Sequence, residues 1–196
     1  MYNFKEKDVL TNVKHRDEKG VVLTFDDGPS KYLDRFLDVL AKEEVGAVFF
    51  WQSRLLHHKR SWKRVLEEGH VIGTHAHSHP NLVKLDYNEQ MKEINTSKKI
   101  IEDITGQQVR YLRPPFGQYN KDTITVASKL KVEMVMWEIS SFDWELKHHP
   151  NKIVENVTSH VQEGSIVLLH ELEQTLHALP TLIKKIKEKG FQFQTL

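Results

Sequence analysis

The sequence VVLTFDDGP, residues 21–29, joins a short apolar run to two adjacent carboxylates and a Gly-Pro pair. An apolar run of this length before a turn signal predicts a buried β-strand over residues 21–25. Successive side chains on a strand point to opposite faces, but the break at Gly28-Pro29 lets Asp26 and Asp27 reach one cleft. One carboxylate can then bind a metal ion while the other accepts a proton. Read alone, the segment also fits a surface turn.

Outward from that strand, short apolar runs alternate with segments of helical period, which is typical of β-α units around a parallel sheet. We expect strands at residues 21–25, 47–51, 70–74, 111–112, 134–139, 166–169 and 191–194. We expect one helix capped by Ser30, and others at residues 62–66, 88–105, 121–130, 152–161 and 181–189. Because the 196 residues contain no repeat, low-complexity stretch or linker, they predict a single barrel-like α/β domain.

The charge balance and the cysteine count exclude several classes of protein. The chain has 28 Lys and Arg against 27 Asp and Glu, so it lacks the basic surplus with which nucleic-acid binders neutralise phosphates. It has no Cys, which excludes disulfides, thiolate nucleophiles and Cys-based zinc sites. No segment approaches the roughly 20 apolar residues of a membrane span. Any metal ion must therefore be bound by nitrogen and oxygen.

The first 12 residues alternate charged and apolar side chains and lack the roughly 7–15-residue apolar run that a secretion signal requires. As written, the chain therefore predicts a cytoplasmic protein. A signal or anchor removed from a longer chain would instead place the protein at the cell envelope or outside the cell. The compartment stays open, as does the oligomeric state.

A second group of candidate metal ligands lies in His75-Ala76-His77-Ser78-His79-Pro80. His75 and His79 are four residues apart, so one helical turn would put both imidazoles on the same side, at the ~2.0–2.1 Å reach of zinc. One added carboxylate gives a set that leaves coordination positions open for water and substrate, as catalytic zinc sites do. A loop that is merely rich in histidine is the alternative, since the chain has 12 His.

The segment Arg113-Pro114-Pro115-Phe116-Gly117 follows another short apolar run. Its prolines stiffen the turn, and Gly117 permits close backbone approach, so a backbone N–H near Phe116 could face the cleft as an oxyanion donor. Arg113 could lie beside a catalytic carboxylate and hold it ionised. The alternative is a rigid structural turn with an exposed arginine.

The segment Ile166-Val167-Leu168-Leu169-His170-Glu171 ends an expected strand with a histidine. Close to a carboxylate such as Asp143, His170 would have a raised pKa and could act as a general acid, with Trp144 as an apolar wall. The alternative is a structural strand end whose histidine has its hydrogen bonds satisfied within the protein. In (β/α) barrels, active-site residues lie at the carboxyl ends of strands, and the polar groups here end four separate expected strands.

Together these segments resemble the polysaccharide deacetylase family, whose catalytic region is the chitooligosaccharide deacetylase homology domain. The matching pieces, in the family's order, are Thr24-Phe25-Asp26-Asp27-Gly28-Pro29, His75-x-x-x-His79-Pro80, Arg113-Pro114-Pro115-Phe116-Gly117, Asp143-Trp144 and Leu168-Leu169-His170. The resemblance covers residues 20–196 as a catalytic domain and leaves residues 1–19 as an N-terminal extension. It implies a distorted (β/α) barrel with fewer than eight strands.

The resemblance also implies one divalent metal ion, held by Asp27, His75 and His79. Zinc suits this set, and cobalt, nickel or iron can occupy it. Asp26 is then the base that takes a proton from the attacking water. His170 is the acid that protonates the leaving amine.

The remaining roles that the resemblance implies surround these five residues. Arg113 orients the base, and Asp143 tunes the acid. The backbone N–H of Phe116 stabilises the oxyanion, and Trp144 and Leu168 line the pocket that binds the substrate.

Four positions depart from the family's pattern. Ala76 stands where Ser or Thr is usual, Phe116 replaces Tyr, Ser140 occupies an acidic position and Glu171 replaces a common Asp. None of them removes a candidate ligand, base or acid. They bear on substrate preference and rate more than on the type of reaction.

The sequence therefore predicts a metal-dependent hydrolase that removes N-acetyl groups from N-acetylhexosamine glycans such as chitooligosaccharide or peptidoglycan. De-O-acetylation of a polysaccharide such as xylan uses the same groups on a better leaving group. A non-catalytic glycan-binding protein is the third hypothesis. A metal-dependent phosphoesterase would need a second metal ion or an array of phosphate-binding cations, and the motifs provide neither.

Overall fold

The strand β2 (Gly20–Gly28) is the longest strand of the described residues. The computed structural model describes residues 9–13 and 20–196, and in it β2 lies between β3 (Ala47–Trp51) and β8 (Ile166–His170), parallel to both. Nearly every residue of these three strands is buried. A parallel strand covered on both faces reads as a continuous apolar run, which explains the sequence pattern of residues 21–25.

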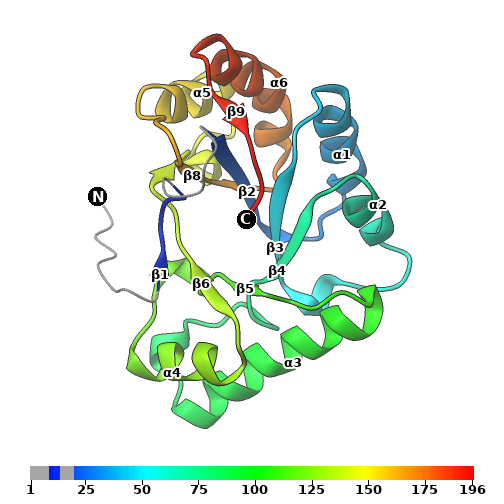
Figure 1. Ribbon diagram of the computed structural model, residues 1–196, viewed down its shortest axis with the longest axis vertical. Helices are drawn as coiled ribbons and strands as arrows, with labels where there is room; N and C mark the ends of the chain where they lie inside the picture. The colour runs from blue at the N-terminus through cyan, green and yellow to red at the C-terminus, as the bar shows by residue number, and fades with distance from the viewer. Residues whose placement is uncertain (1–8, 14–19) are drawn as a thin grey trace.

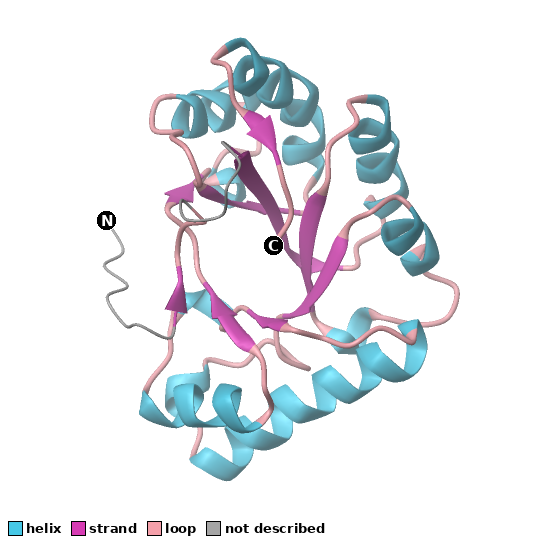
Figure 2. Cartoon of the chain, viewed as in Figure 1, coloured by secondary structure: helices cyan, strands magenta, loops and turns pink. Residues whose placement is uncertain are grey.

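The sheet of the described chain follows the order β1-β6-β5-β4-β3-β2-β8-β7, and β9 pairs with β2 outside this path. The shorter strands are β1 (Val9–Leu10), β4 (Val71–Thr74), β5 (Tyr111–Leu112), β6 (Glu133–Val135), β7 (Ile139–Ser140) and β9 (Gln192–Phe193). Figure 2 shows the strands curled around a centre with the helices outside. The predicted single-domain α/β barrel-like fold is confirmed.

The number of strands differs from the prediction of fewer than eight, since eight strands of the described residues follow one path in the sheet. Of the nine strands in residues 9–13 and 20–196, four have only two residues, namely β1, β5, β7 and β9. So short a strand leaves almost no periodic signal in the sequence. β1 and β7 stand at the two ends of the path, so the barrel is a distorted one.

The helices cover the outside of the curled sheet (Figure 1). They are α1 (Leu33–Lys42), α2 (Trp62–Glu67), α3 (Tyr87–Thr105), α4 (Lys121–Lys129), α5 (Pro150–Thr158) and α6 (Glu173–Glu188). The described part of the chain also has four single 3₁₀ turns: η1 (Ser53–Leu55), η2 (Leu82–Lys84), η3 (Pro115–Gly117) and η4 (Asp143–Glu145). Within the described ranges, no helix combines the length and the apolar character needed to cross a bilayer.

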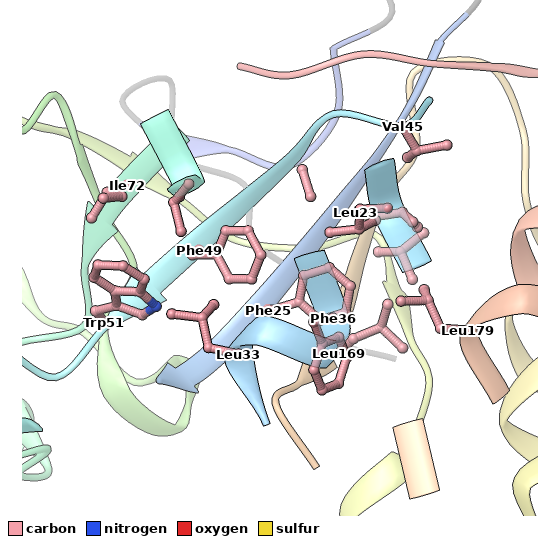
Figure 3. Close-up of a cluster of buried hydrophobic side chains, with 14 of the residues drawn as sticks. Leu23, Phe25, Leu33, Phe36, Val45, Phe49, Trp51, Ile72, Leu169 and Leu179 are labelled. Atoms are coloured by element: carbon pink, nitrogen blue, oxygen red, sulfur yellow. The ribbon is translucent and has the colours of Figure 1, made fainter. Parts of the chain in front are cut away.

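Aromatic side chains between the sheet and α1 form the centre of the core. The ring of Phe25 on β2 stacks on Phe49 of β3 at a centroid distance of 5.3 Å and meets Phe36 of α1 edge-on at 5.1 Å. Figure 3 shows these rings together with Leu169 of β8. Burying each such side chain contributes roughly 1.5–3 kcal/mol, so the core holds β2, β3 and β8 firmly in register.

The expected strand at residues 134–139 is in fact two strands, β6 and β7. The apolar pattern runs through Met136 and Trp137, but backbone carbonyls in this segment accept hydrogen bonds from a side chain. Arg113 donates from Nε to the carbonyl of Val135 and from Nη2 to that of Met136, at 3.1 and 2.8 Å. These bonds from a residue distant in sequence interrupt the hydrogen bonding between strands. The local hydrophobic periodicity of the sequence does not indicate them.

Two helix boundaries also differ from the prediction. The last helix begins at Glu173 and not at residue 181, and it runs through Pro180, although proline normally breaks or kinks a helix interior. The N-cap of α1 is Tyr32, not Ser30. The hydroxyl of Ser30 accepts a hydrogen bond from the Tyr32 N–H at 3.0 Å, so it closes the turn that precedes the helix.

Part of the predicted N-terminal extension belongs to the sheet. Val9 and Leu10 pair with β6, and Asn12 forms an isolated bridge with Ser165. The rest of the extension, residues 1–8 and 14–19, lies outside the described residues. The division of the chain into an N-terminal extension, residues 1–19, and a catalytic domain, residues 20–196, stays a prediction.

The capping box of α3 provides a test of local stability. The Asp86 carboxylate accepts from the Glu89 N–H, and the Glu89 carboxylate accepts from the Asp86 N–H, both at 2.9 Å. We expect Asp86→Ala to lower the free energy of unfolding by about 1 kcal/mol, measured by urea denaturation. Asp103→Ala, which changes an exposed aspartate in the last turn of the same helix, is the control, and an equal loss in it would contradict the assignment.

Candidate active site

Asp26 and Asp27 both face one pocket at the carboxyl end of β2, although neighbours on a strand normally alternate. The backbone explains this exception. Asp27 has a left-handed φ of 68°, and the pairing with β3 shifts register between Asp26 and Gly28. This irregularity turns Asp27 back toward the side that Asp26 faces. Asp26 is buried, whereas the side chain of Asp27 is 41% exposed.

Asp27, His75 and His79 form a cluster whose ligand atoms all lie within 4.8 Å of one another. The Oδ1 atom of Asp27 is 3.3 Å from Nε2 of His79 and 3.8 Å from Nε2 of His75. The two histidines lie on a loop after β4 and not on a helical turn as expected. Instead, left-handed φ values of 64° at Ala76 and 63° at His79 turn the loop so that the two imidazoles lie together.

The hydrogen bonding of these side chains fits a divalent metal ion. Nδ1 of His75 is 2.7 Å from the carbonyl oxygen of Arg113, which only accepts, so Nδ1 carries the proton and Nε2 keeps its lone pair toward the cluster. Burial and the neighbouring His75 lower the pKa of His79, which favours its neutral, ligating form. Burial acts to raise the pKa of Asp27, but the positive charges that His75, His170 and His79 carry when protonated outweigh it and lower that pKa. Two imidazoles and a carboxylate are a donor set for such an ion.

Arg113 lies beneath the pocket and is completely buried. Its Nη1 donates to Oδ1 of Asp26 at 2.9 Å and to the hydroxyl of Thr24 at 2.6 Å. Its guanidinium lies 4.3 Å from the centroid of the Phe50 ring. Because one oxygen of Asp26 is held by Arg113, the other, Oδ2, remains toward the pocket, 3.7 Å from Nε2 of His75.

His170, at the end of β8, is held by the fully buried Asp143 of η4. Its Nδ1 lies 2.7 Å from Oδ1 of Asp143, and its backbone N–H donates to Oδ2 at the same distance. The hydroxyl of Thr175 also donates to Oδ2, at 2.6 Å. The Nε2 atom of His170 is left facing the cluster, 4.0 Å from Oδ2 of Asp27.

The pocket has a volume of about 510 Å³, and eight of the ten predicted site residues line it. Arg113 and Asp143 lie behind this surface, each bonded to a residue that lines it. Phe116 stands on one wall with a left-handed φ of 60°, its ring edge-on to His79 at 4.6 Å. Trp144 also lines the pocket and lies against His170, with ring centroids 5.3 Å apart. The structure therefore brings all ten predicted residues together.

Several residues at the site were not predicted from the sequence. Gln52 donates from Nε2 to Oδ1 of Asp27 at 2.8 Å, and Trp137 and Leu172 line the pocket. Phe142 lies next to Trp144, at a centroid distance of 5.4 Å, and is 42% exposed. Gln52 could have been predicted from the sequence, because it directly follows the expected strand at residues 47–51 and therefore lies at the same edge of the sheet as the other site residues. No sequence pattern indicates Phe142.

Comparison with known proteins agrees with this geometry. The family model described as polysaccharide deacetylase matches residues 13–135. The peptidoglycan-N-acetylmuramic acid deacetylase PdaC of Bacillus subtilis is 33% identical over 183 residues, which cover 92% of this chain and 38% of PdaC. The chain thus spans about two fifths of the length of this relative.

Two solved structures show the same fold in proteins of different activity. The Bc1960 peptidoglycan N-acetylglucosamine deacetylase has a TM-score of 0.85 at 30% identity, over 96% of this chain and 90% of that one. BA3943 of Bacillus anthracis, a CE4 family pseudoenzyme, has a TM-score of 0.84 at 29% identity, over 93% of this chain and 65% of that one. The matched family range and the shared fold lead to one conclusion: this chain belongs to the polysaccharide deacetylase family of hydrolases.

Proposed function

We propose that this protein is a metal-dependent deacetylase that hydrolyses N-acetyl groups on the N-acetylhexosamine units of a glycan. The observation that carries the proposal is the set of groups that meet in one pocket. A cluster fit for a cation, Asp27 with two histidines, lies beside a held carboxylate, Asp26, and a held imidazole, His170. PdaC and Bc1960 are named as peptidoglycan deacetylases, which supports peptidoglycan as the substrate, with chitooligosaccharide as a related one.

Asp27, His75 and His79 would hold the metal ion. Their nitrogen and oxygen donors suit zinc, and cobalt, nickel or iron can bind the same set. A metal ion held there would supply Lewis-acid chemistry, polarising the acetyl carbonyl and the water beside it. The side chains around it then carry the proton transfers.

Asp26 is the proposed base. Arg113 occupies its Oδ1, so the proton of the attacking water is transferred to Oδ2, the oxygen that faces the pocket. Arg113 is bonded at the same time to two backbone carbonyls, those of Val135 and Met136, so the position of Asp26 is fixed before substrate binds. A base that is already in place avoids reorganisation during the reaction.

His170 is the proposed acid. Burial alone would lower its pKa, but the hydrogen bond and the charge of Asp143 outweigh burial and raise the pKa to about 9. The imidazole is then protonated at neutral pH, and Asp143 holds Nδ1, so Nε2 delivers its proton to the leaving nitrogen. An amine is a poor leaving group unless protonated, so this arrangement favours amide over ester hydrolysis.

Residues on the walls of the pocket also have proposed roles. The backbone N–H of Phe116 is the proposed oxyanion donor, and Trp144 and Leu168 provide apolar surface for the acetyl methyl group. Phe116, Phe142 and Trp144 are also among the exposed large apolar side chains of the described residues. Aromatic faces beside a polar pocket suit the apolar face of a sugar ring.

Metal removal tests the reaction itself. We expect the zinc-loaded protein to release acetate from N-acetylglucosamine oligomers and from peptidoglycan, faster than from O-acetylated xylan oligosaccharides. Chelation should reduce the rate at least ~100-fold, because the cation stabilises the charge that develops on the carbonyl oxygen. Added zinc or cobalt should restore it. Undiminished acetate release from protein shown by metal analysis to be metal-free would contradict the mechanism.

Substitution of the base separates catalysis from metal binding. We expect Asp26→Asn to keep one metal ion per chain, measured by elemental analysis, and to lose acetate release by roughly 10²–10⁴-fold. Asp27→Asn is the matched variant on the adjacent residue, and it should lose metal affinity as well. Full activity in Asp26→Asn would show that another group is the base.

The pairing of His170 with Asp143 predicts a pH dependence. In Asp143→Asn the pKa of His170 should fall well below about 9, because the raising carboxylate is gone while the lowering effect of burial remains. NMR titration of the imidazole in metal-free protein measures this directly. Asp122→Asn, at an exposed aspartate of α4, is the control.

The same pair links stability to pH. Since the folded-state pKa of His170 is raised, its contribution to stability is complete below the ordinary histidine pKa and is lost as the pH rises through about 9. Wild-type protein should show this loss in urea unfolding at different pH values, and Asp143→Asn should not. An unchanged His170 titration in Asp143→Asn would refute the assignment.

A further inference from the structure

Three residues that follow β3, Gln52, Ser53 and Arg54, lie between the two turns that carry the candidate metal ligands. Gln52 contacts the turn after β2 twice. Its backbone N–H donates to the carbonyl of Gly28 at 2.9 Å, and its side-chain Nε2 donates to Oδ1 of Asp27 at 2.8 Å. Gln52 is only 6% exposed, so these bonds are shielded from water.

Arg54 determines which end of the Gln52 amide faces Asp27. The Nε atom of Arg54 lies 2.9 Å from Oε1 of Gln52. A guanidinium only donates, so this oxygen accepts and the NH₂ group must point to the carboxylate. An ionised carboxylate oxygen has two lone pairs, so Oδ1 can accept from Gln52 and still face the two imidazoles.

The other side of the segment is bonded to the loop that carries the two histidines. The Ser53 N–H donates to the carbonyl of Ala76 at 3.4 Å, and the Arg54 N–H donates to that of His77 at 3.3 Å. The hydroxyl of Ser53 lies 2.8 Å from Nδ1 of His77. Ser53 is 2% exposed, so this contact also lies in the interior.

Both turns hold non-glycine residues in left-handed backbone, with φ of 68° at Asp27, 64° at Ala76 and 63° at His79. Such residues are strained, and they persist only where surrounding contacts enforce the conformation. The bonds from residues 52–54 end on Asp27 and Ala76 themselves and on the neighbours Gly28 and His77. They are therefore placed to enforce it.

We propose that Gln52, Ser53 and Arg54 form a clamp that positions Asp27 against His75 and His79 and so sets the affinity for the divalent ion. The proposal rests on the metal-binding part of the proposed function. Gln52 is a positioning residue in it, acting on the ion only through Asp27. The clamp does not depend on which glycan is the substrate.

Direct metal binding tests the clamp. We expect Gln52→Ala to weaken zinc binding about 10–100-fold, the range typical of groups that orient a metal ligand, in competition with a chromophoric chelator. The melting temperature of the metal-free variant should stay close to that of metal-free wild type. Gln194→Ala is the matched control, since its Nε2 donates to the carbonyl of Gly20 at the other end of β2.

A double-mutant cycle tests the part played by Arg54. Arg54→Lys keeps the positive charge near the site but removes the rigid donor that orients the amide, so it should weaken zinc binding less than Gln52→Ala does. In the Gln52→Ala background, Arg54→Lys should cause no further loss, because the amide that it orients is gone.

Three results would overturn the clamp: unchanged zinc affinity in Gln52→Ala, an equal loss in Gln194→Ala, or independent effects of the Gln52 and Arg54 changes. Zinc affinity is measured without glycan, so a protein that binds zinc with the predicted variant pattern but releases no acetate supports the clamp and refutes the proposed activity. A wild-type protein that binds no divalent ion refutes both.

Discussion

The buried ion pair between Arg113 and Asp26 is the interaction on which the site depends. The guanidinium is removed from water, and such a charge is tolerated only when it is paired and fully hydrogen-bonded. Arg113 meets this need with Asp26, a hydroxyl and two carbonyls, and its own carbonyl fixes the tautomer of His75. One residue therefore holds the proposed base, orients a candidate metal ligand and interrupts the expected strand at residues 134–139.

Much of the fold and of the site was predictable because both follow from strands. Continuous apolar runs marked β2, β3 and β8, and polar residues at strand ends marked the pocket. The features that were missed depend on contacts between distant segments. The break after Val135 reflects bonds to Arg113, and the helix through Pro180 reflects packing that overrides the local signal. Neither leaves a periodic pattern in the sequence.

The shared fold of deacetylases and a pseudoenzyme places the function in side chains rather than in the barrel. Two departures from the family's pattern show how this chain adapts. Glu171 accepts from the Ser30 N–H and from the indole of Trp51, at 2.8 and 3.0 Å, so its extra length ties the turn after β2 to β3. Phe116 packs its ring on His79, a contact that needs no hydroxyl.

The last strand, β9, and the candidate active-site pocket lie at opposite ends of β2. β9 pairs with Gly20 and Val21, at the amino end of β2, whereas the pocket lies at the carboxyl end of the same strand. At about 3.3 Å per residue, the nine residues of β2 separate these two ends by roughly 26 Å. A segment joined just beyond the last strand would start on the face away from the candidate active-site pocket, so it would leave the mouth of that pocket free for the proposed glycan.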